Sequence, residues 1–138
     1  MNYYNLTDEQ AARMNVDYDF CACLEYNPQP FNLFDVDRVL AVVEGERVLK
    51  DWHWVVLLRD GRFVYLQGGC DYTGWDCQSS ADCEFYDSGE QAAKGSVGRS
   101  QENTPETQAS LLSQIESGKQ ETWRESKDKE FGLRPNKD

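Results

Sequence analysis

A chain of 138 residues with 39% apolar and 12% aromatic residues can bury a core of its own, so we expect one folded domain and not a disordered segment. Its net charge of −11 leaves no basic surface to neutralise phosphates, which argues against direct nucleic-acid binding. No apolar run approaches the roughly 18–20 residues of a membrane helix, and the first residues carry no basic or apolar signal, so we expect a cytoplasmic protein without membrane contact.

The negative charge is unevenly distributed along the chain. Residues 1–90 hold 6 Lys or Arg against 17 Asp or Glu, whereas residues 91–138 hold 8 of each. We therefore expect an acidic α+β core over 1–90, a polar connection over 91–104, and a helical segment over 105–138 that packs on the core. An acidic surface of this kind is either simply solvated or contacts a basic partner, in the extreme case by mimicking nucleic acid.

Two short elements are predicted near the N-terminus. Thr7 and Gln10 have the spacing of a capping box, which predicts a helix over residues 8–14. Residues 17–26 are rich in aromatics and cysteine and predict a strand, which ends before Pro28.

An apolar stripe with helical spacing follows. Val36, Val39, Leu40 and Val43 fall at i, i+3, i+4 and i+7, and Gly45 stands where a C-terminal cap is expected. This spacing predicts an amphipathic helix.

The clearest local pattern is a β-hairpin. Asp60 and Gly61 separate two apolar, β-rich runs, 52–58 and 63–67, which is typical of a two-residue type I′ turn. Both faces of this hairpin are apolar, so we expect cover on both sides. The resulting fold class is α+β: a small antiparallel sheet built on a central hairpin (about 52–67), packed by short helices.

A two-residue turn also predicts the register of the hairpin. Leu58 then lies opposite Phe63, and His53 lies opposite Gly68. One predicted face carries Trp52, Trp54, Val56, Leu58, Phe63 and Tyr65, and the other carries His53, Val55, Leu57, Val64 and Leu66.

The rest of the chain predicts one more strand and several helices. Residues 82–86 predict a third strand, and 89–94 a helical turn. Thr104, followed by a proline and an acid, predicts the start of a helix that Gly118 interrupts. A second helical stretch is predicted over 119–130, and two aromatics in this charged tail indicate that it packs back on the domain.

The loop over residues 68–77 is the most unusual segment. Its three glycines permit close backbone approaches, and its aromatics stand among acids, as in a recognition surface. The alternative is a structural loop whose Tyr72 and Trp75 plug the end of the sheet. The candidate partner-binding residues are Asp71, Tyr72, Thr73, Trp75 and Asp76.

Cysteines and the single histidine offer a second, weaker candidate site. Cys70, Cys77, Cys83 and His53 could form a metal cage, but gaps of six and five residues fit no standard zinc knuckle. A Cys70–His53 pair would meet the minimum demand for a catalytic thiol. We expect free thiols, because five cysteines cannot all pair and a cytoplasmic chain rarely forms disulfides. The sequence predicts no bound metal and no cofactor.

Residues 51–79 resemble a family of small uncharacterised proteins of bacteriophages and bacteria. The resemblance extends to Glu44-Gly45-Glu46 and to residues 121–125 and 129–132. It implies a small accessory protein, encoded by a phage, and it carries no established activity or ligand residue. The residues that carry it are Trp52, Trp54, Val55, Leu58, Asp60, Gly61, Arg62, Phe63, Tyr65, Leu66 and the run Gly68-Gly69-Cys70-Asp71-Tyr72-Thr73-Gly74-Trp75-Asp76-Cys77-Gln78-Ser79.

These patterns favour a non-catalytic, protein-binding accessory protein. In this hypothesis it modulates or inhibits a host or defence protein with a basic surface, through its acidic face and the 68–77 loop. One alternative is a thiol- or metal-dependent enzyme centred on Cys70, Cys77 and His53. A second alternative is a structural subunit of a larger assembly, and the sequence leaves the oligomeric state open.

Overall fold

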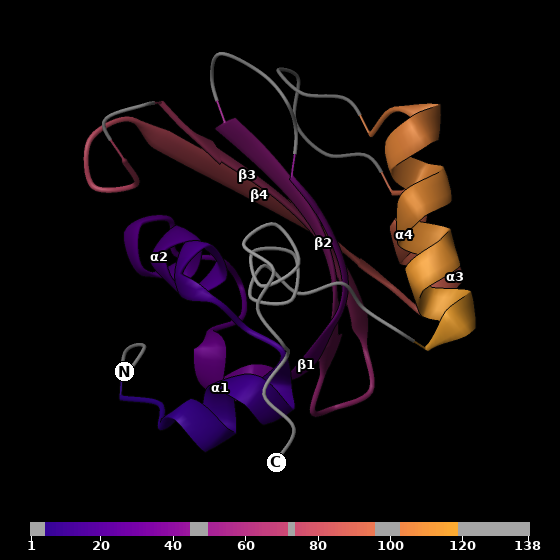
Figure 1. The fold of residues 1–138 in the computed structure, drawn as a ribbon, viewed down its shortest axis with the longest axis horizontal. Coiled ribbons are helices and arrows are strands. Elements are labelled where there is room, and N and C mark those ends of the chain that lie inside the picture. The colour runs from indigo at the N-terminus through magenta and orange to yellow at the C-terminus, as the bar shows by residue number, and fades with distance from the viewer. Residues whose placement is uncertain (1–4, 45–49, 72–73, 96–102, 119–138) are drawn as a thin grey trace, which may run out of the picture.

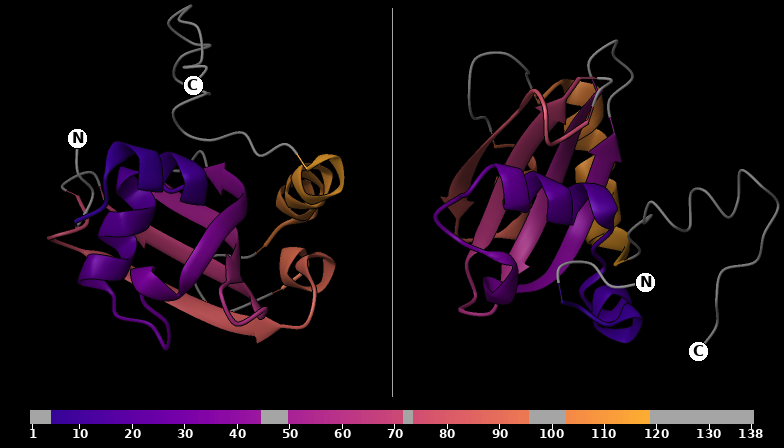
Figure 2. Two further views of the ribbon diagram at one scale, coloured as in Figure 1. Left: turned by 90° about the horizontal axis from the view of Figure 1, so that it is seen from below. Right: turned by 90° about the vertical axis from the view of Figure 1, so that its left-hand side faces the viewer.

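The protein folds into one antiparallel sheet with helices on both faces. The computed structural model describes residues 5–44, 50–71, 74–95 and 103–118. Four strands lie in the order β1-β2-β3-β4, so each pairs with its neighbour in the sequence. Helices α1 (Asp8–Met14) and α2 (Tyr18–Tyr26) cover one face, and α3 (Gly89–Ala93) and α4 (Pro105–Ser117) cover the other (Figure 1, Figure 2). The predicted α+β class is confirmed, with cover on both faces of the hairpin.

Helix α1 forms where the capping box predicts it. The Thr7 hydroxyl accepts a hydrogen bond from the Gln10 N–H at 3.1 Å, and the Gln10 side chain accepts one from the Thr7 N–H at 2.9 Å. Asn15 then ends the helix in the left-handed region, with φ of 59°. Both signals are local to the sequence, which is why the prediction is confirmed.

The strand predicted over residues 17–26 is wrong, because this segment forms helix α2. Asp17 is the N-cap, and its carboxylate accepts a hydrogen bond from the Phe20 N–H at 2.9 Å. Phe20, Cys23 and Leu24 are all buried, and their spacing of i, i+3, i+4 is that of one helical face. The β-forming preference of the aromatics is overridden by this cap and this buried face.

The helix predicted from Val36 onward is also wrong, because these residues form strand β1 (Val36–Glu44). Its pairing with β2 (Lys50–Leu58) shifts register twice, between Val36 and Arg38 and between Val39 and Ala41. Each irregularity adds one residue to β1, so the spacing of side chains on one face becomes three and imitates a helix. Gly45, the predicted cap, lies outside the described residues.

The hairpin between β2 and β3 (Phe63–Cys70) is confirmed, but its turn contains three residues. The Leu58 N–H donates to the Arg62 carbonyl at 2.9 Å, and the Gly61 N–H donates to the Leu58 carbonyl at 3.0 Å. Gly61 has φ of +93°, as expected for the last residue of a three-residue hairpin loop. The predicted two-residue turn is therefore wrong.

The longer turn shifts the register of β3 by one residue. Phe63 pairs with Leu57, and Gly68 pairs with Trp52. A one-residue shift moves every side chain of a strand to the other face, so the predicted faces are correct for β2 and reversed for β3. Val64 and Leu66 accordingly pack in the core under α1 and α2, and Tyr65 packs in the core under α3 and α4.

The predicted elements that remain within the described residues agree with the structure. Strand β4 (Ser79–Tyr86) includes the predicted strand, and α3 corresponds to the predicted helical turn. Thr104 caps α4, which begins at a proline and ends at Gly118 with φ of +69°. A short 3-10 turn, η1 (Leu33–Asp35), precedes β1. The helical stretch predicted over 119–130 lies outside the described residues.

Two hydrophobic cores lie on opposite faces of the sheet. The core on the α1/α2 face includes Phe20, Trp52, Trp54 and Trp75. The core on the α3/α4 face is smaller and includes Tyr65 and Leu111. Within the described ranges, no helix is both long enough and apolar enough to cross a membrane.

Candidate functional site

The described part of the 68–77 loop is anchored by a buried tryptophan. Trp75 is 4% exposed, its ring centroid lies 5.1 Å from that of Trp52, and its indole N–H donates to the Asp19 carboxylate at 3.0 Å. Trp75 thus ties the loop to α2 and fits the structural interpretation, because a partner cannot reach it. Tyr72 and Thr73 lie outside the described residues.

The two described acids of this loop differ in exposure. Asp71 is half-buried and Asp76 is exposed. Of the three candidate partner-binding residues that the structure describes, Asp76 is therefore the one that is exposed at the surface.

Gly68, at the start of this loop, lies directly beneath α2. A Cβ added there would lie 2.7 Å from Sγ of Cys23, closer than real Cβ contacts allow. The glycine lets the sulfur of α2 rest directly on β3.

The cysteines and His53 are not brought together. Cys70 packs in the core on the α1/α2 face, whereas His53 contacts Tyr65, which belongs to the opposite face. Cys77 is exposed in the loop, and Cys83 is half-buried on β4. Across the described ranges no three His, Cys, Asp or Glu side chains are grouped so that they could hold a metal ion.

The buried thiols are also poor nucleophiles. Burial raises the pKa of Cys21 to about 12, and burial together with Glu84 and Asp82 raises the pKa of Cys83 to about 11. Burial raises the pKa of Cys23 as well, with a contribution from Cys70. Because the thiolate is the reactive form, these side chains are protonated and inert at neutral pH.

The strongest chemical grouping is one that the sequence analysis missed. His53 Nδ1 lies 2.7 Å from the Tyr65 hydroxyl, and His53 Nε2 lies 3.1 Å from Oδ2 of Asp51. Burial, and then the Asp51 carboxylate, raises the pKa of Tyr65, so its hydroxyl keeps its proton. In the neutral imidazole that carries its proton on Nε2, His53 donates to Asp51 and accepts from the Tyr65 hydroxyl.

The Asp51–His53–Tyr65 network has the residue types of an acid–base relay, but its side chains are not accessible to a substrate. Its members are 4%, 2% and 0% exposed, so no substrate atom can approach them. Oδ1 of Asp51 is buried and has no hydrogen-bond partner among the described residues. We interpret the network as a structural polar cluster. Its one signal in the sequence was the spacing of Asp51 and His53, two residues apart on one strand. The predicted register was wrong and placed Tyr65 on the face opposite His53, so their contact was not predicted.

The two edges of the sheet differ in where side chains bond to the backbone, and on β1 these bonds lie in the middle of the strand, at Val39 and Val42. The Gln114 side chain accepts a hydrogen bond from the Val42 N–H at 3.1 Å and donates one to the Val42 carbonyl at 3.0 Å. The Asn15 side chain donates to the Val39 carbonyl at 3.1 Å. Side-chain amides of α4 and of Asn15, the residue that caps α1, therefore take the place of a neighbouring strand at Val39 and Val42.

The β4 edge is closed only at its two ends. The Gln29 side chain donates to the Ala81 carbonyl at 3.2 Å, and the Gln91 side chain accepts from the Asp87 N–H at 3.2 Å. Alternate residues of a strand direct their backbone groups to the same side, so Cys83 and Phe85 also point away from β3. Their N–H and C=O groups have no hydrogen-bond partner within the described ranges. We call this two-residue stretch the open edge.

The side chains beside the open edge have opposite characters on the two faces. Cys83 and Phe85 pack against the α1/α2 core, and Phe31 meets Phe85 edge-on, with ring centroids 6.3 Å apart. Asp82 and Glu84 alternate with them and are exposed on the α3/α4 face, where neither makes an ion pair with any residue that the structure describes. The open edge is thus apolar on one side and acidic on the other.

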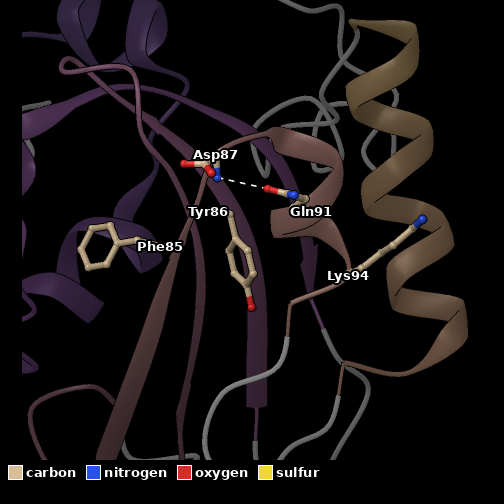
Figure 3. A pocket seen from close by; sticks show the side chains of 5 residues that line it. All are labelled: Phe85, Tyr86, Asp87, Gln91 and Lys94. Atoms are coloured by element: carbon tan, nitrogen blue, oxygen red, sulfur yellow. Dashed lines mark hydrogen bonds between the residues drawn. The ribbon is translucent and has the colours of Figure 1, made fainter.

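An open pocket of about 400 Å³ lies at the end of this edge, where β4 passes into α3. In Figure 3, Tyr86 lies between β4 and α3 while Phe85 points to the other side of the strand. Lys94, at the end of α3, pairs with Glu90 at 3.4 Å. The residues that line the pocket are Phe85, Tyr86, Asp87, Gln91 and Lys94.

Comparisons with protein-family models, with curated proteins and with solved structures give no match to this chain.

Proposed function

We propose that this protein is a non-catalytic accessory protein that binds a basic segment of a partner protein along β4. The observation that carries the proposal is the open edge, where the outward backbone groups of Cys83 and Phe85 bond to no residue that the structure describes and lie beside two exposed acids. An exposed strand edge with unpaired N–H and C=O groups is a template for an added strand. The net charge of −11 favours a basic partner and speeds its encounter.

The same geometry argues against a second copy of this chain as the occupant. Two copies that paired through β4 would share one symmetric contact, and the acids of one strand would face the acids of the other. Like charges opposite each other on neighbouring strands are destabilising. A basic strand from another protein meets no such repulsion.

The resemblance to small phage and bacterial proteins supplies the biological setting of the proposal. In that setting the protein is encoded by a phage and modulates or inhibits a protein of the host or of its defences. The binding surface moves from the 68–77 loop to β4, because Trp75 is buried in the core.

A proline substitution tests the proposal. In Cys83→Pro the ring replaces an N–H that the β3–β4 ladder does not use, so the strand tolerates it, while an added strand loses a donor and meets a steric block. Cys83→Ala is the matched control, because it removes the same thiol and keeps the N–H. We expect affinity capture from the native host, read by mass spectrometry, to recover the same partner with wild type and Cys83→Ala, and to lose it with Cys83→Pro. Thermal melting checks that both variants fold. A partner that folded Cys83→Pro retains at wild-type levels would contradict binding at this edge.

A further inference from the structure

The two faces of β4 define which partner segment fits the open edge, and this inference rests on the function proposed above. In a sheet, residues paired on neighbouring strands point to the same face. Residues of an added strand that pair with Asp82 and Glu84 therefore point to the exposed α3/α4 side. Those that pair with Cys83 and Phe85 point to the side of the α1/α2 core.

Each side favours a different chemistry. On the α3/α4 side, Asp82 and Glu84 are exposed carboxylates without a described ion-pair partner, so a lysine or arginine beside them gains an attractive cross-strand pair. On the other side, the half-buried Phe85 ring packs on Phe31, and an apolar side chain beside it extends the core surface. Arg62 already lies over this ring, with its guanidinium carbon 4.5 Å from the centroid, so a second cation there would be repelled.

We infer that the open edge recognises an extended segment in which basic and apolar residues alternate. Four consecutive residues are enough to span Asp82 to Phe85, two of them basic and two apolar. The segment gains backbone hydrogen bonds from Cys83 and Phe85, and its charge pattern sets the register, because a shift by one residue would place its cations over Phe85.

The length available to the segment is bounded. At one end Gln29 occupies the Ala81 carbonyl, and at the other Gln91 occupies the Asp87 N–H. These two side chains close the edge beyond the open stretch, so a longer added strand would have to displace them. A short linear motif therefore fits the site better than a complete edge strand of a folded domain.

Three synthetic peptides of equal length and charge test the inference. The first alternates lysine and valine over six residues, the second has the three lysines followed by the three valines, and the third is the alternating peptide with N-methylated valines. All three carry the same charge, so non-specific electrostatic attraction to an acidic protein predicts the same affinity for each. Only the first combines one basic face with free backbone donors.

We expect fluorescence anisotropy to show the alternating peptide binding wild type about tenfold more tightly than either other peptide, which is the range of two cross-strand pairs and two backbone hydrogen bonds. The preference should disappear in Cys83→Pro and persist in Cys83→Ala. In the double variant Asp82→Asn/Glu84→Gln the affinity should fall and depend less on salt. The N-methylated peptide keeps the test valid even where Cys83→Pro fails to fold, because it changes only the ligand.

Equal binding of the alternating and block peptides would overturn the inference. Where the captured partner is still lost with Cys83→Pro, that result would leave the proposed function standing and remove only the alternating pattern. A partner that survives Cys83→Pro would instead remove the proposed function, so the two failures are distinguishable.

Discussion

At the scale of single residues, the buried Asp51–His53–Tyr65 network makes a clear prediction for stability. Tyr65→Phe removes the hydroxyl that lies 2.7 Å from His53 Nδ1 and keeps the ring that fills the α3/α4 core. A buried acceptor that loses its donor costs about 1–2 kcal/mol, and urea denaturation should show a loss of that size.

Tyr86→Phe is the matched control for that substitution. Tyr86 is half-buried on the same face, and its hydroxyl makes no hydrogen bond with the residues that the structure describes, so its removal should stay within about 0.5 kcal/mol. Equal losses in the two variants would show that the network contributes nothing specific.

Asp17 makes the stability of the fold depend on pH in a defined direction. Burial, reinforced by the carboxylates of Asp19 and Glu44, raises the pKa of Asp17 from 3.8 to about 6, against the opposing hydrogen bond from Phe20. Since the folded-state pKa is the higher one, the folded state holds the proton more strongly. The contribution of this group is therefore fully present below about pH 4 and is lost as the pH rises through about 6.

Asp17→Asn should remove this dependence. The amide cannot ionise, and its oxygen can still cap α2 at Phe20. We expect the variant to match wild type near pH 4 and to exceed it at pH 7 by up to about 3 kcal/mol, from urea midpoints measured across the range. Asp17→Ala also lacks the charge but loses the cap, so it should lie about 1 kcal/mol below Asp17→Asn at every pH. A constant difference between Asp17→Asn and wild type from pH 4 to 7 would exclude the raised pKa.

At the scale of elements, the docking of α2 on β3 depends on Gly68. In Gly68→Ala the new Cβ would lie 2.7 Å from Sγ of Cys23 and 3.3 Å from ring atoms of Trp54 and Trp75. Overpacking a core in this way costs about 1–3 kcal/mol, and we expect denaturant unfolding to show it.

The double variant Gly68→Ala/Cys23→Ala tests whether the sulfur is the cause. Removing Sγ opens the space that the new methyl group needs, so the two substitutions together should cost less than the sum of their separate costs. If the two costs simply add, the strain arises between the new methyl group and the rings of Trp54 and Trp75.

Local signals in the sequence predicted the elements whose causes are local. The capping box at Thr7, the proline start of α4 and the Asp60-Gly61 turn were each recognised in the correct place. Strand β1 was mistaken for a helix because its two register irregularities arise from pairing with β2 and give a spacing of three residues. Strand pairing is a property of the folded chain, and no local pattern records it.

The candidate site could not be predicted from the sequence, because it also depends on how the strands pair. A turn of two or three residues is compatible with an Asp-Gly pair, and the choice decides which side chains of β3 meet His53. The open edge depends on which strand ends the sheet and on whether an amide from a distant helix reaches it, as Gln114 reaches β1. The sequence showed that the first 90 residues are acidic, but not that two of the acids lie on the edge strand β4.

At the scale of the whole molecule, the acids of β4 should control self-association. In Asp82→Asn/Glu84→Gln the repulsion between two β4 strands is removed while the open edge stays, so a second copy becomes an acceptable occupant. We expect size-exclusion chromatography with light scattering to show a larger species for this variant than for wild type. Adding Cys83→Pro should return the variant to the size of wild type. A variant that elutes like wild type at high protein concentration would mean that charge does not protect this edge.

The unequal treatment of the two sheet edges should also be visible in the rate at which single amide hydrogens exchange with solvent. Along β4 the amides of Asp82 and Glu84 face β3, while those of Cys83 and Phe85 face outward, so slow and fast exchange should alternate from one residue to the next. The outward amide of Val42 on β1 should exchange slowly, because Gln114 holds it. When a segment adds to β4, the fast amides of Cys83 and Phe85 become slow, and the alternation disappears. The exchange rates of single amides in β4 therefore show whether the open edge is paired.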